Sequence, residues 1–302
     1  MSLLSRLLYP PITRLAITAP PGAPTRAGIA IVLIVRNEAR HIAEWARFHH
    51  AAGVSRFFVY ENGPGDGTIE AIRAALPAEA LTVIPWAQSR FRTTRNREIH
   101  NQVLAYAHAL MNFGPAFRWM AFIDVDEFLV PVSAPSIPRA LEGLEDAAHI
   151  SLPWQMFGRG GHATPPEGGV VANYTARARD SFALKHGLNF KCLVDPARVT
   201  EVGVHEFGID GTAQGINDAG RPAPHKDRSN PAFASRARLQ LNHYYTRSDA
   251  ELQAKIARGS NKDVQADKHI RRVLRIVAAI EADTVEDRTA IDFVARLHAA
   301  TP

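Results

Sequence analysis

The 302-residue chain has very little cysteine, and this scarcity limits the chemistry that it can carry out. Its one cysteine, Cys192, can form no intramolecular disulfide and cannot build a zinc site of several cysteines, so we expect a reducing compartment. Long hydrophobic runs are also missing. The longest, Gly28–Val35, is far shorter than the roughly 18 residues that span a bilayer, so no membrane-spanning helix is predicted.

The chain also has little net charge, because 35 Lys and Arg against 30 Asp and Glu give +5 with neutral histidines. A surplus this small suits a phosphate-bearing ligand and argues against a nucleic-acid binder. The hydrophobic fraction of 46% excludes disorder throughout the chain. We predict a cytoplasmic protein. The basic, apolar segment 1–18 is either a frayed tail, a strap over the core or a peripheral contact with the inner face of a membrane.

Strand-like and helix-like segments alternate through the first 130 residues. Continuous apolar runs predict strands that are buried on both faces, and a period near 3.6 predicts helices. This alternation is typical of an open α/β sheet, whose ligands bind beyond the carboxyl ends of the strands. The expected strands are Ile29–Val35, Arg56–Tyr60, Leu81–Pro85 and Trp119–Ile123, and the expected helices are Glu38–Ala52, Thr68–Ala75 and Glu98–Met111.

After Val130 the pattern changes to short strands and glycine-rich or proline-rich stretches. The segment Phe207–Phe233 is long, polar and without periodicity, which predicts a loop. We predict a tail or linker over 1–27, one α/β domain over 28–262 that divides near 130, and C-terminal helices over 263–302, without a second independent core. The expected late helices are Asp249–Arg258, His269–Ala282 and Val285–Ala299.

The most informative cluster is Asp124-Val125-Asp126-Glu127-Phe128, which directly follows the fourth expected strand. Alternation along an extended segment puts Asp124 and Asp126 on one face. Two carboxylates there could hold Mg²⁺ or Mn²⁺, which would be shared with substrate phosphates. The plain alternative is a charged turn after a strand.

Two further polar clusters follow the first and second strands. They comprise Arg36, Asn37 and Glu38, and then Glu61, Asn62 and Asp66 within the turn ENGPGDGT. Backbone N–H groups at the start of the helix after the first cluster could meet an anion or a nucleotide base. The carboxylates of the second cluster could accept hydrogen bonds from a base or ribose. Taken singly, each cluster is also explained as a helix cap or an ordinary strand-to-helix turn.

In this order, the motifs resemble the nucleotide-sugar glycosyltransferases of the GT-A fold, most closely the family-2-like subgroup that includes glycosyltransferase family 92. The resemblance spans Ile29–Gly259. It rests on RNE, ENGPGDGT, FIDVDEF, Trp154–His162 (WQMFGRGGH), Val204-His205 and Asn242–Ser248 (NHYYTRS). Two residues depart from the family pattern. Pro64 replaces a serine, and Arg159 replaces a small residue, which would alter the acceptor side.

The resemblance implies a GT-A type (Rossmann-like) open mixed sheet with helices on both faces and C-terminal helices. It implies inverting transfer of a sugar from a UDP-linked donor to a hydroxyl of a glycan, polysaccharide or glycolipid. Mn²⁺ or Mg²⁺ would neutralise the leaving diphosphate. The implied metal ligands are Asp126 and either His243 or His205. Asp124 would bind the metal through water or else contact the ribose. Glu127 would brace the site, and Arg247 and Lys255 would face the phosphates.

On the acceptor side, the resemblance implies a platform of Trp154, Phe157 and His162, although a core pair explains the aromatics equally well. An inverting reaction needs a general base on the acceptor hydroxyl, and the sequence leaves four candidates open: Glu206, Asp195, Asp180 and His162. Lys191 would bind phosphate or acceptor, or only extend its ammonium to water. A non-catalytic nucleotide-sugar-binding or carbohydrate-binding protein on the same fold is the alternative. A dehydrogenase is disfavoured, because RNEA stands where GxGxxG would be required.

Overall fold

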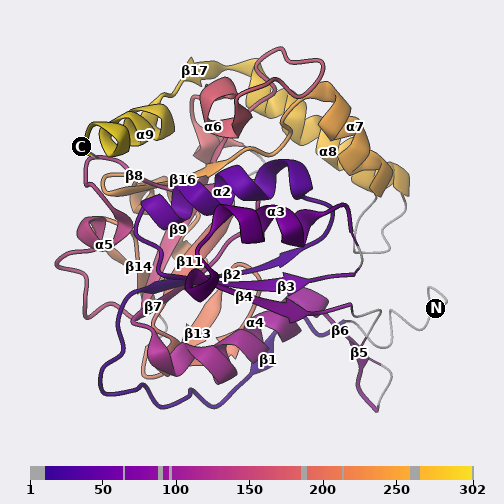
Figure 1. Ribbon diagram of the computed structural model, residues 1–302. Coiled ribbons are helices and arrows are strands. Elements are labelled where there is room, and N and C mark those ends of the chain that lie inside the picture. Colours follow the sequence, from indigo (N-terminus) through magenta and orange to yellow (C-terminus); the bar gives the residue numbers. More distant parts are fainter. Residues whose placement is uncertain are drawn as a thin grey trace.

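The computed structural model describes residues 11–63, 65–87, 91–94, 97–184, 189–212, 214–258 and 266–300. They form a mixed α/β fold in which helices lie on both sides of a large sheet (Figure 1). The predicted α/β architecture is therefore confirmed. Among these residues, no helix is both long enough and apolar enough to cross a bilayer.

A mixed sheet forms the middle layer. Its main path runs, in spatial order, through β4 (Leu81–Pro85), β3 (Arg56–Glu61), β2 (Ile29–Val35), β7 (Trp119–Phe122), β11 (Phe190–Val194), β9 (His149–Met156), β14 (Gln214–Ile216) and β15 (Pro222–Pro224). The first four strands are parallel, whereas β11 is antiparallel to both of its neighbours. The parallel strands therefore end at one common edge, where ligands bind in sheets of this kind.

One late strand brings distant residues to that edge. β16 (Leu239–His243) pairs parallel to β9 and antiparallel to β8 (Glu127–Pro131). Its last residue, His243, pairs with Glu127 across the ladder. The end of β16 thus lies beside the acidic turn that follows β7.

Helices α2 (Ala39–Ala51) and α3 (Thr68–Ala75) cover one face of the sheet, and α4 (Asn101–Phe113) covers the other (Figure 1). On the side of α2 and α3 the later helices also pack. They are α5 (Ile137–Ala140), α6 (Gly169–Asn173), α7 (Asp249–Arg258), α8 (Ala266–Ala282) and α9 (Thr289–Ala300). The smaller strands are β1 (Leu15–Ala16), β5 (Phe91–Arg92), β6 (Glu98–Ile99), β10 (Ala176–Ala178), β12 (Val199–Val202), β13 (Phe207–Ile209) and β17 (Thr284–Glu286).

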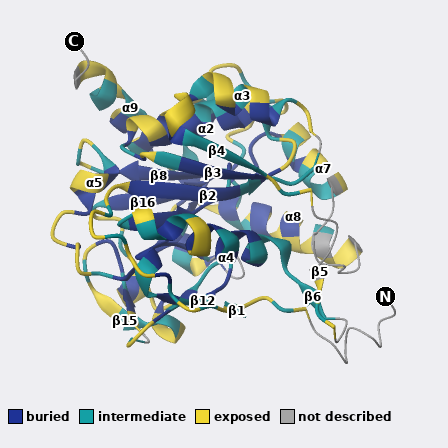
Figure 2. Cartoon of the chain, turned by 60° about the horizontal axis from the view of Figure 1, so that its bottom comes forward, coloured by how far each residue is buried: buried dark blue, intermediate teal, exposed yellow. Residues whose placement is uncertain are grey.

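Alternating residues of β2 point into two different cores. Ile31 and Leu33 belong to the cluster under α2, while Ala30 and Val32 belong to the cluster under α4, and all four side chains are fully buried. Figure 2 shows the same strand in dark blue between exposed helix surfaces. This burial on both faces explains the uninterrupted apolar run in the sequence. The domain boundaries predicted above stay a prediction.

Several predicted elements have the observed bounds, among them Ile29–Val35, Thr68–Ala75 and Asp249–Arg258. The prediction of one loop over Phe207–Phe233 is wrong, because β13, β14, β15 and short 3₁₀ turns occupy it. Strands of three residues are too short for a periodic signal. The last predicted helix begins later than expected, at Thr289, because β17 precedes it.

Candidate active site

The glycine-rich turn after β3 caps helix α2. Oδ2 of Asp66 accepts a hydrogen bond from the backbone N–H of Ala39 at 3.1 Å, and Oδ1 accepts one from Oγ1 of Thr68 at 2.6 Å. Thr68 Oγ1 in turn accepts from the backbone N–H of Glu38 at 2.9 Å. Although burial opposes it, these hydrogen bonds lower the pKa of Asp66. The turn therefore fixes the polar cluster after β2, where Asn37 takes a left-handed φ of 58°.

Asp124 is held by a buried lysine. Its Oδ2 accepts from Nζ of Lys191 at 2.8 Å, and its Oδ1 accepts from Nε2 of Gln102 at 3.1 Å. Glu127 is completely buried, and its carboxylate accepts from the backbone N–H of Asp124 at 2.7 Å and from Nε1 of Trp154 at 2.6 Å. Although burial opposes it, the charges of Asp124 and Glu127 raise the pKa of Lys191 well above its usual value. Glu127 and Lys191 together brace the acidic turn.

Asp126 faces a different set of side chains. Its Oδ2 lies 3.4 Å from Nε2 of His243 and 3.6 Å from Nζ of Lys255. The backbone N–H of Tyr244 donates to the carbonyl of Asp126 at 2.8 Å, which ties the end of β16 to the turn. Although burial opposes it, His243, Lys255 and Arg247 lower the pKa of Asp126 well below its usual value. Burial lowers the pKa of His243 against the opposing effect of Asp126, so an ionised carboxylate faces a neutral imidazole.

A cavity of about 300 Å³ opens beside Asp126. The start of α2, the glycine-rich turn, the segment after β16 and α7 contribute to its walls. The lining residues include Asn37, Glu38, Arg40, His41, Asp66, Asp126, Tyr244, Tyr245, Thr246, Arg247, Glu251, Ala254 and Lys255.

Arg247 is a buried cation in these walls. Its Nη1 lies 3.3 Å from Oε2 of Glu38, but Nε and Nη2 are buried without a hydrogen-bond partner among the described residues. Oγ1 of the neighbouring Thr246 is also buried without a hydrogen-bond partner among the described residues. Buried donors without partners are costly, so a ligand that accepts hydrogen bonds here would be favoured.

Glu251 fixes the wall on the α7 side. It accepts hydrogen bonds from the backbone N–H of Ser248 at 3.0 Å and from Oγ of Ser248 at 2.6 Å, and its other oxygen lies 2.5 Å from Nε2 of His41. Although burial opposes it, the hydrogen bonds of His41 and Ser248 lower the pKa of Glu251 to about 2. Neither Glu251 nor His41 is among the site residues predicted from the sequence. The capping-box pattern Ser-x-x-Glu over 248–251 could have indicated Glu251.

Asp126 and His243 fit a divalent cation as a pair. Two ligand bonds of about 2.1 Å that meet at roughly 90–110° span about 3.0–3.4 Å. The separation of 3.4 Å between Asp126 Oδ2 and His243 Nε2 falls at the end of this range. Asp124 is turned to Lys191 instead, and the described residues contain no group of three or more His, Cys, Asp or Glu side chains arranged around a metal. Water and substrate phosphates would have to complete the coordination.

Residues 29–272 match the profile of glycosyltransferase family 92. The chain belongs to glycosyltransferase family 92. This match confirms the resemblance that the ordered motifs indicate.

Curated members of family 92 from plants are similar over half of this chain. A family 92 protein of Oryza sativa subsp. japonica is 28% identical over 156 residues, which cover 49% of this chain and 24% of that protein. A family 92 protein of Ricinus communis is 26% identical over 156 residues, which cover 49% of this chain and 26% of that protein. The match thus spans about a quarter of each relative's length. A solved mycobacterial protein shares 16% identity at a TM-score of 0.33, over 74% of this chain and 69% of that chain.

In this family 92 chain, the three residues predicted to form the acceptor platform lie in different surroundings. Phe157 is 1% exposed within the hydrophobic core, so its prediction as a stacking surface is wrong. Nε2 of His162 lies 3.2 Å from the carbonyl of Asn173, and His162 is not among the described residues that line the cavity. Trp154 does lie at the site, since its ring centroid is 4.2 Å from that of His243.

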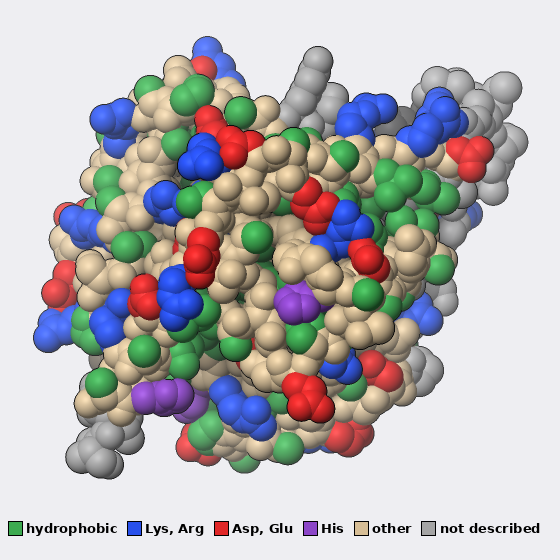
Figure 3. Space-filling model, turned by 90° about the horizontal axis from the view of Figure 1, so that it is seen from above, with side chains coloured by type: hydrophobic (Ala, Val, Ile, Leu, Met, Phe, Trp, Pro, Cys, Tyr) green, Lys and Arg blue, Asp and Glu red, His purple; other side chains and the backbone are tan. Residues whose placement is uncertain are grey.

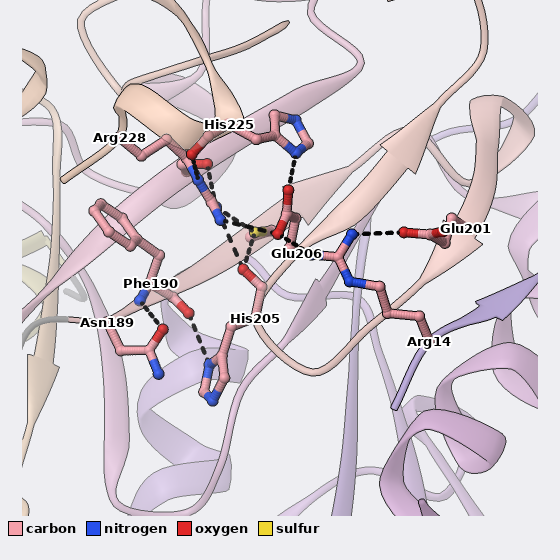
Figure 4. A network of polar contacts seen from close by, with 10 residues as sticks. Arg14, Asn189, Phe190, Glu201, His205, Glu206, His225 and Arg228 are labelled. Atoms are coloured by element: carbon pink, nitrogen blue, oxygen red, sulfur yellow. Dashed lines mark hydrogen bonds and ion pairs between the residues drawn. The ribbon is translucent and has the colours of Figure 1, made fainter. Parts of the chain in front are cut away.

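Glu206 lies in a separate ion-pair cluster (Figure 4). Its carboxylate lies 2.6 Å from Nδ1 of His225, 2.5 Å from Nη2 of Arg14 and 3.8 Å from Nη2 of Arg228. Although burial opposes it, His225, Arg14 and Arg228 lower the pKa of Glu206. A carboxylate held by three partners is a poor proton acceptor, so the structure speaks against Glu206 as the general base.

His205 and the second polar cluster also lie apart from the cavity. Nδ1 of His205 donates to the carbonyl of Phe190 at 3.0 Å, and burial lowers the pKa of His205 to about 3. His205 makes no hydrogen bond or ion pair with Asp124 or Asp126, so His243 is the better metal candidate. Four of the predicted donor-binding residues are not among the described residues that line the cavity. They are Arg36, Glu61, Asn62 and Asp124.

Proposed function

We propose that this chain is a metal-dependent glycosyltransferase that moves a sugar from a UDP-linked donor to a hydroxyl of a glycan, polysaccharide or glycolipid, with inversion. One observation carries the proposal. Asp126 and the buried, partly unpartnered guanidinium of Arg247 line one cavity at the carboxyl edge of a parallel sheet, and Nε2 of His243 lies 3.4 Å from the Asp126 carboxylate. This combination suits a diphosphate with a bound cation.

The side chains of the cavity would share the work of binding the donor. Arg247 would place its positive charge opposite the phosphate oxygens, since it lines the cavity. A Mn²⁺ or Mg²⁺ ion, held by Asp126 and His243, would supply positive charge opposite the leaving diphosphate. Lys255 would keep the Asp126 carboxylate in place, because its Nζ donates to the carbonyl of Tyr245 at 2.7 Å and lies 3.6 Å from Asp126.

The nucleoside and the acceptor would then occupy opposite sides of this charge cluster. Asn37, Glu38 and Asp66 offer hydrogen-bonding groups for a base or ribose at the α2 end of the cavity. Trp154 offers a partly exposed aromatic face beside His243 for the sugar.

One observation favours a second function, that of a non-catalytic nucleotide-sugar-binding or carbohydrate-binding protein on the same fold. The carboxylate of Asp124 is engaged by Lys191 and Gln102, which leaves one carboxylate and one imidazole for a cation. A binding protein would need no more than this.

The two functions differ in turnover. We would incubate the protein with UDP-sugars and GDP-sugars in the presence of Mn²⁺ and measure release of the free nucleotide. Asp126→Asn should reduce the rate by about 100-fold or more, as expected for loss of charge stabilisation at the leaving group. Asp283→Asn is a matched control, because Asp283 is two-thirds exposed and pairs only with Arg179 at the surface. Nucleotide binding without turnover would favour the second function, and equal turnover in both variants would contradict the proposed site.

A further inference from the structure

Helix α8 presents basic side chains that the fold does not use. One side of the helix packs on the protein through Val273, Ile276, Val277 and Ile280. The opposite side is exposed and carries the set that we name the α8 basic face: Lys268, Arg271, Arg272, Leu274 and Arg275.

The cations of the α8 basic face have no acidic partners among the described residues. Only Arg271 makes a hydrogen bond, from its Nε to the backbone carbonyl of Asp267 at 3.2 Å. Some exposed arginines elsewhere, such as Arg36, Arg47 and Arg73, likewise make no ion pair among the described residues, but they do not lie together on one helix. Others are paired. Arg159, for example, contacts both Asp249 and Glu281. Four cations within eight residues thus form a positive strip, next to one exposed carboxylate at Asp267, on a chain whose net charge is +5.

Leu274 gives this strip an apolar tip. Its side chain is 45% exposed, and in the described part of the chain only Met111, at 44%, is a comparably exposed large hydrophobic residue. Seen from above, the right-hand side of the molecule carries Lys and Arg side chains together with hydrophobic and some acidic ones, and Figure 1 shows α8 on this side (Figure 3). Cations around an exposed aliphatic side chain suit a lipid surface better than a soluble polyanion, which offers nothing apolar.

The α8 basic face also lies close to the cavity. Val273 and Val277 of α8 pack on Leu252 of α7, and α7 supplies Glu251 and Lys255 to the cavity wall. A surface that binds α8 would therefore lie beside the proposed active site.

We propose that the α8 basic face docks this protein on an anionic lipid bilayer. Phosphate headgroups would take up the unpaired cations, and Leu274 would enter the boundary between headgroups and acyl chains. If the proposed function holds, this docking selects a glycolipid among the possible acceptors. The docking itself does not require that function.

Vesicle co-sedimentation tests the docking with the whole chain. We expect binding to vesicles that contain phosphatidylglycerol, at least about tenfold weaker binding to pure phosphatidylcholine, and loss of binding at high salt. The variant Arg271→Glu/Arg275→Glu should weaken binding by at least about 25-fold, from about fivefold per cation. The matched control is Arg47→Glu/Arg73→Glu, which reverses two exposed arginines on α2 and α3 and should bind like the wild type.

Several results would overturn the docking proposal. They are equal binding to both vesicle types, equal losses in the two double variants, and binding to heparin without binding to vesicles, which would indicate a soluble polyanion instead. Binding of UDP and Mn²⁺ is measured on the same proteins without vesicles. Its absence would contradict the proposed function and leave the vesicle result unaffected.

Discussion

Lys191→Met should destabilise the protein strongly, because Lys191 is the counter-charge of the buried Glu127 carboxylate and of the partly exposed Asp124 carboxylate. The Lys191 side chain is 1% exposed, and its Nζ lies 2.8 Å from Asp124 Oδ2 and 3.4 Å from Glu127 Oε2. Glu127 is not exposed at all. Methionine fills a similar volume but leaves both carboxylates without a counter-charge.

Breaking a buried ion pair from one side typically costs about 3–5 kcal/mol, because the remaining charge stays buried. We expect a loss in this range for Lys191→Met above about pH 8, where Glu127 is ionised in the wild-type protein. The loss should be smaller at neutral and acidic pH, because burial raises the pKa of Glu127 to about 8 against the opposing charge of the Lys191 ammonium. Protonation of Glu127 would then relieve the unpaired charge in the variant.

Urea unfolding of both proteins across a pH series measures this difference in the free energy of unfolding. The double variant Lys191→Met/Glu127→Gln should recover part of the loss. Arg179→Met is the matched control, because its ion pair with Asp283 at 3.1 Å is exposed and should contribute less than about 1 kcal/mol. A loss for Lys191→Met as small as that of the control, or a loss that does not change with pH, would refute the reasoning.

Three further predictions concern stability and the cavity. Asp66→Ala removes the cap on Ala39 and should lower the free energy of unfolding by about 1 kcal/mol in urea titrations, and an unchanged midpoint would argue against the cap. Burial lowers the pKa of both His49 and His205 to about 3. The pKa of an unfolded histidine is near 6.5, so below this pH the unfolded chain takes up protons that the two buried histidines do not. The free energy of unfolding should therefore fall as the pH decreases from about 6.5 toward 3, and thermal midpoints that stay constant from pH 7 to pH 4 would contradict this. Glu251→Gln should weaken UDP binding by several-fold in calorimetry through loss of the His41 contact, while an unchanged affinity would show that this wall does not shape the site.

The sequence predicts the parallel strands and the edge of the sheet well, because local patterns determine them. Ile29–Val35 is buried on both faces, and the apolar run records that burial directly. Asp126 stands out for the same reason, as a carboxylate in the short turn after a buried strand. These features depend only on residues that are close together in the sequence.

The partners of these residues depend on tertiary contacts that no local pattern shows. Lys191 reaches Asp124 across 67 residues, so its buried ion pair could not be inferred from the strand in which it lies. The same limit led to the wrong assignment of Phe157, since an aromatic residue in a glycine-rich segment fits a platform as well as a core. Glu206 was a reasonable base candidate until its contacts with Arg14 and His225 were visible.

Titration calorimetry of UDP in the presence and absence of Mn²⁺ tests the central claim most directly. The account predicts that Mn²⁺ strengthens UDP binding to the wild-type protein by at least about tenfold, and that Asp126→Asn removes this gain while the thermal midpoint stays that of a folded protein. UDP binding that does not depend on Mn²⁺, or a Mn²⁺ effect of equal size in Asp126→Asn, would contradict it.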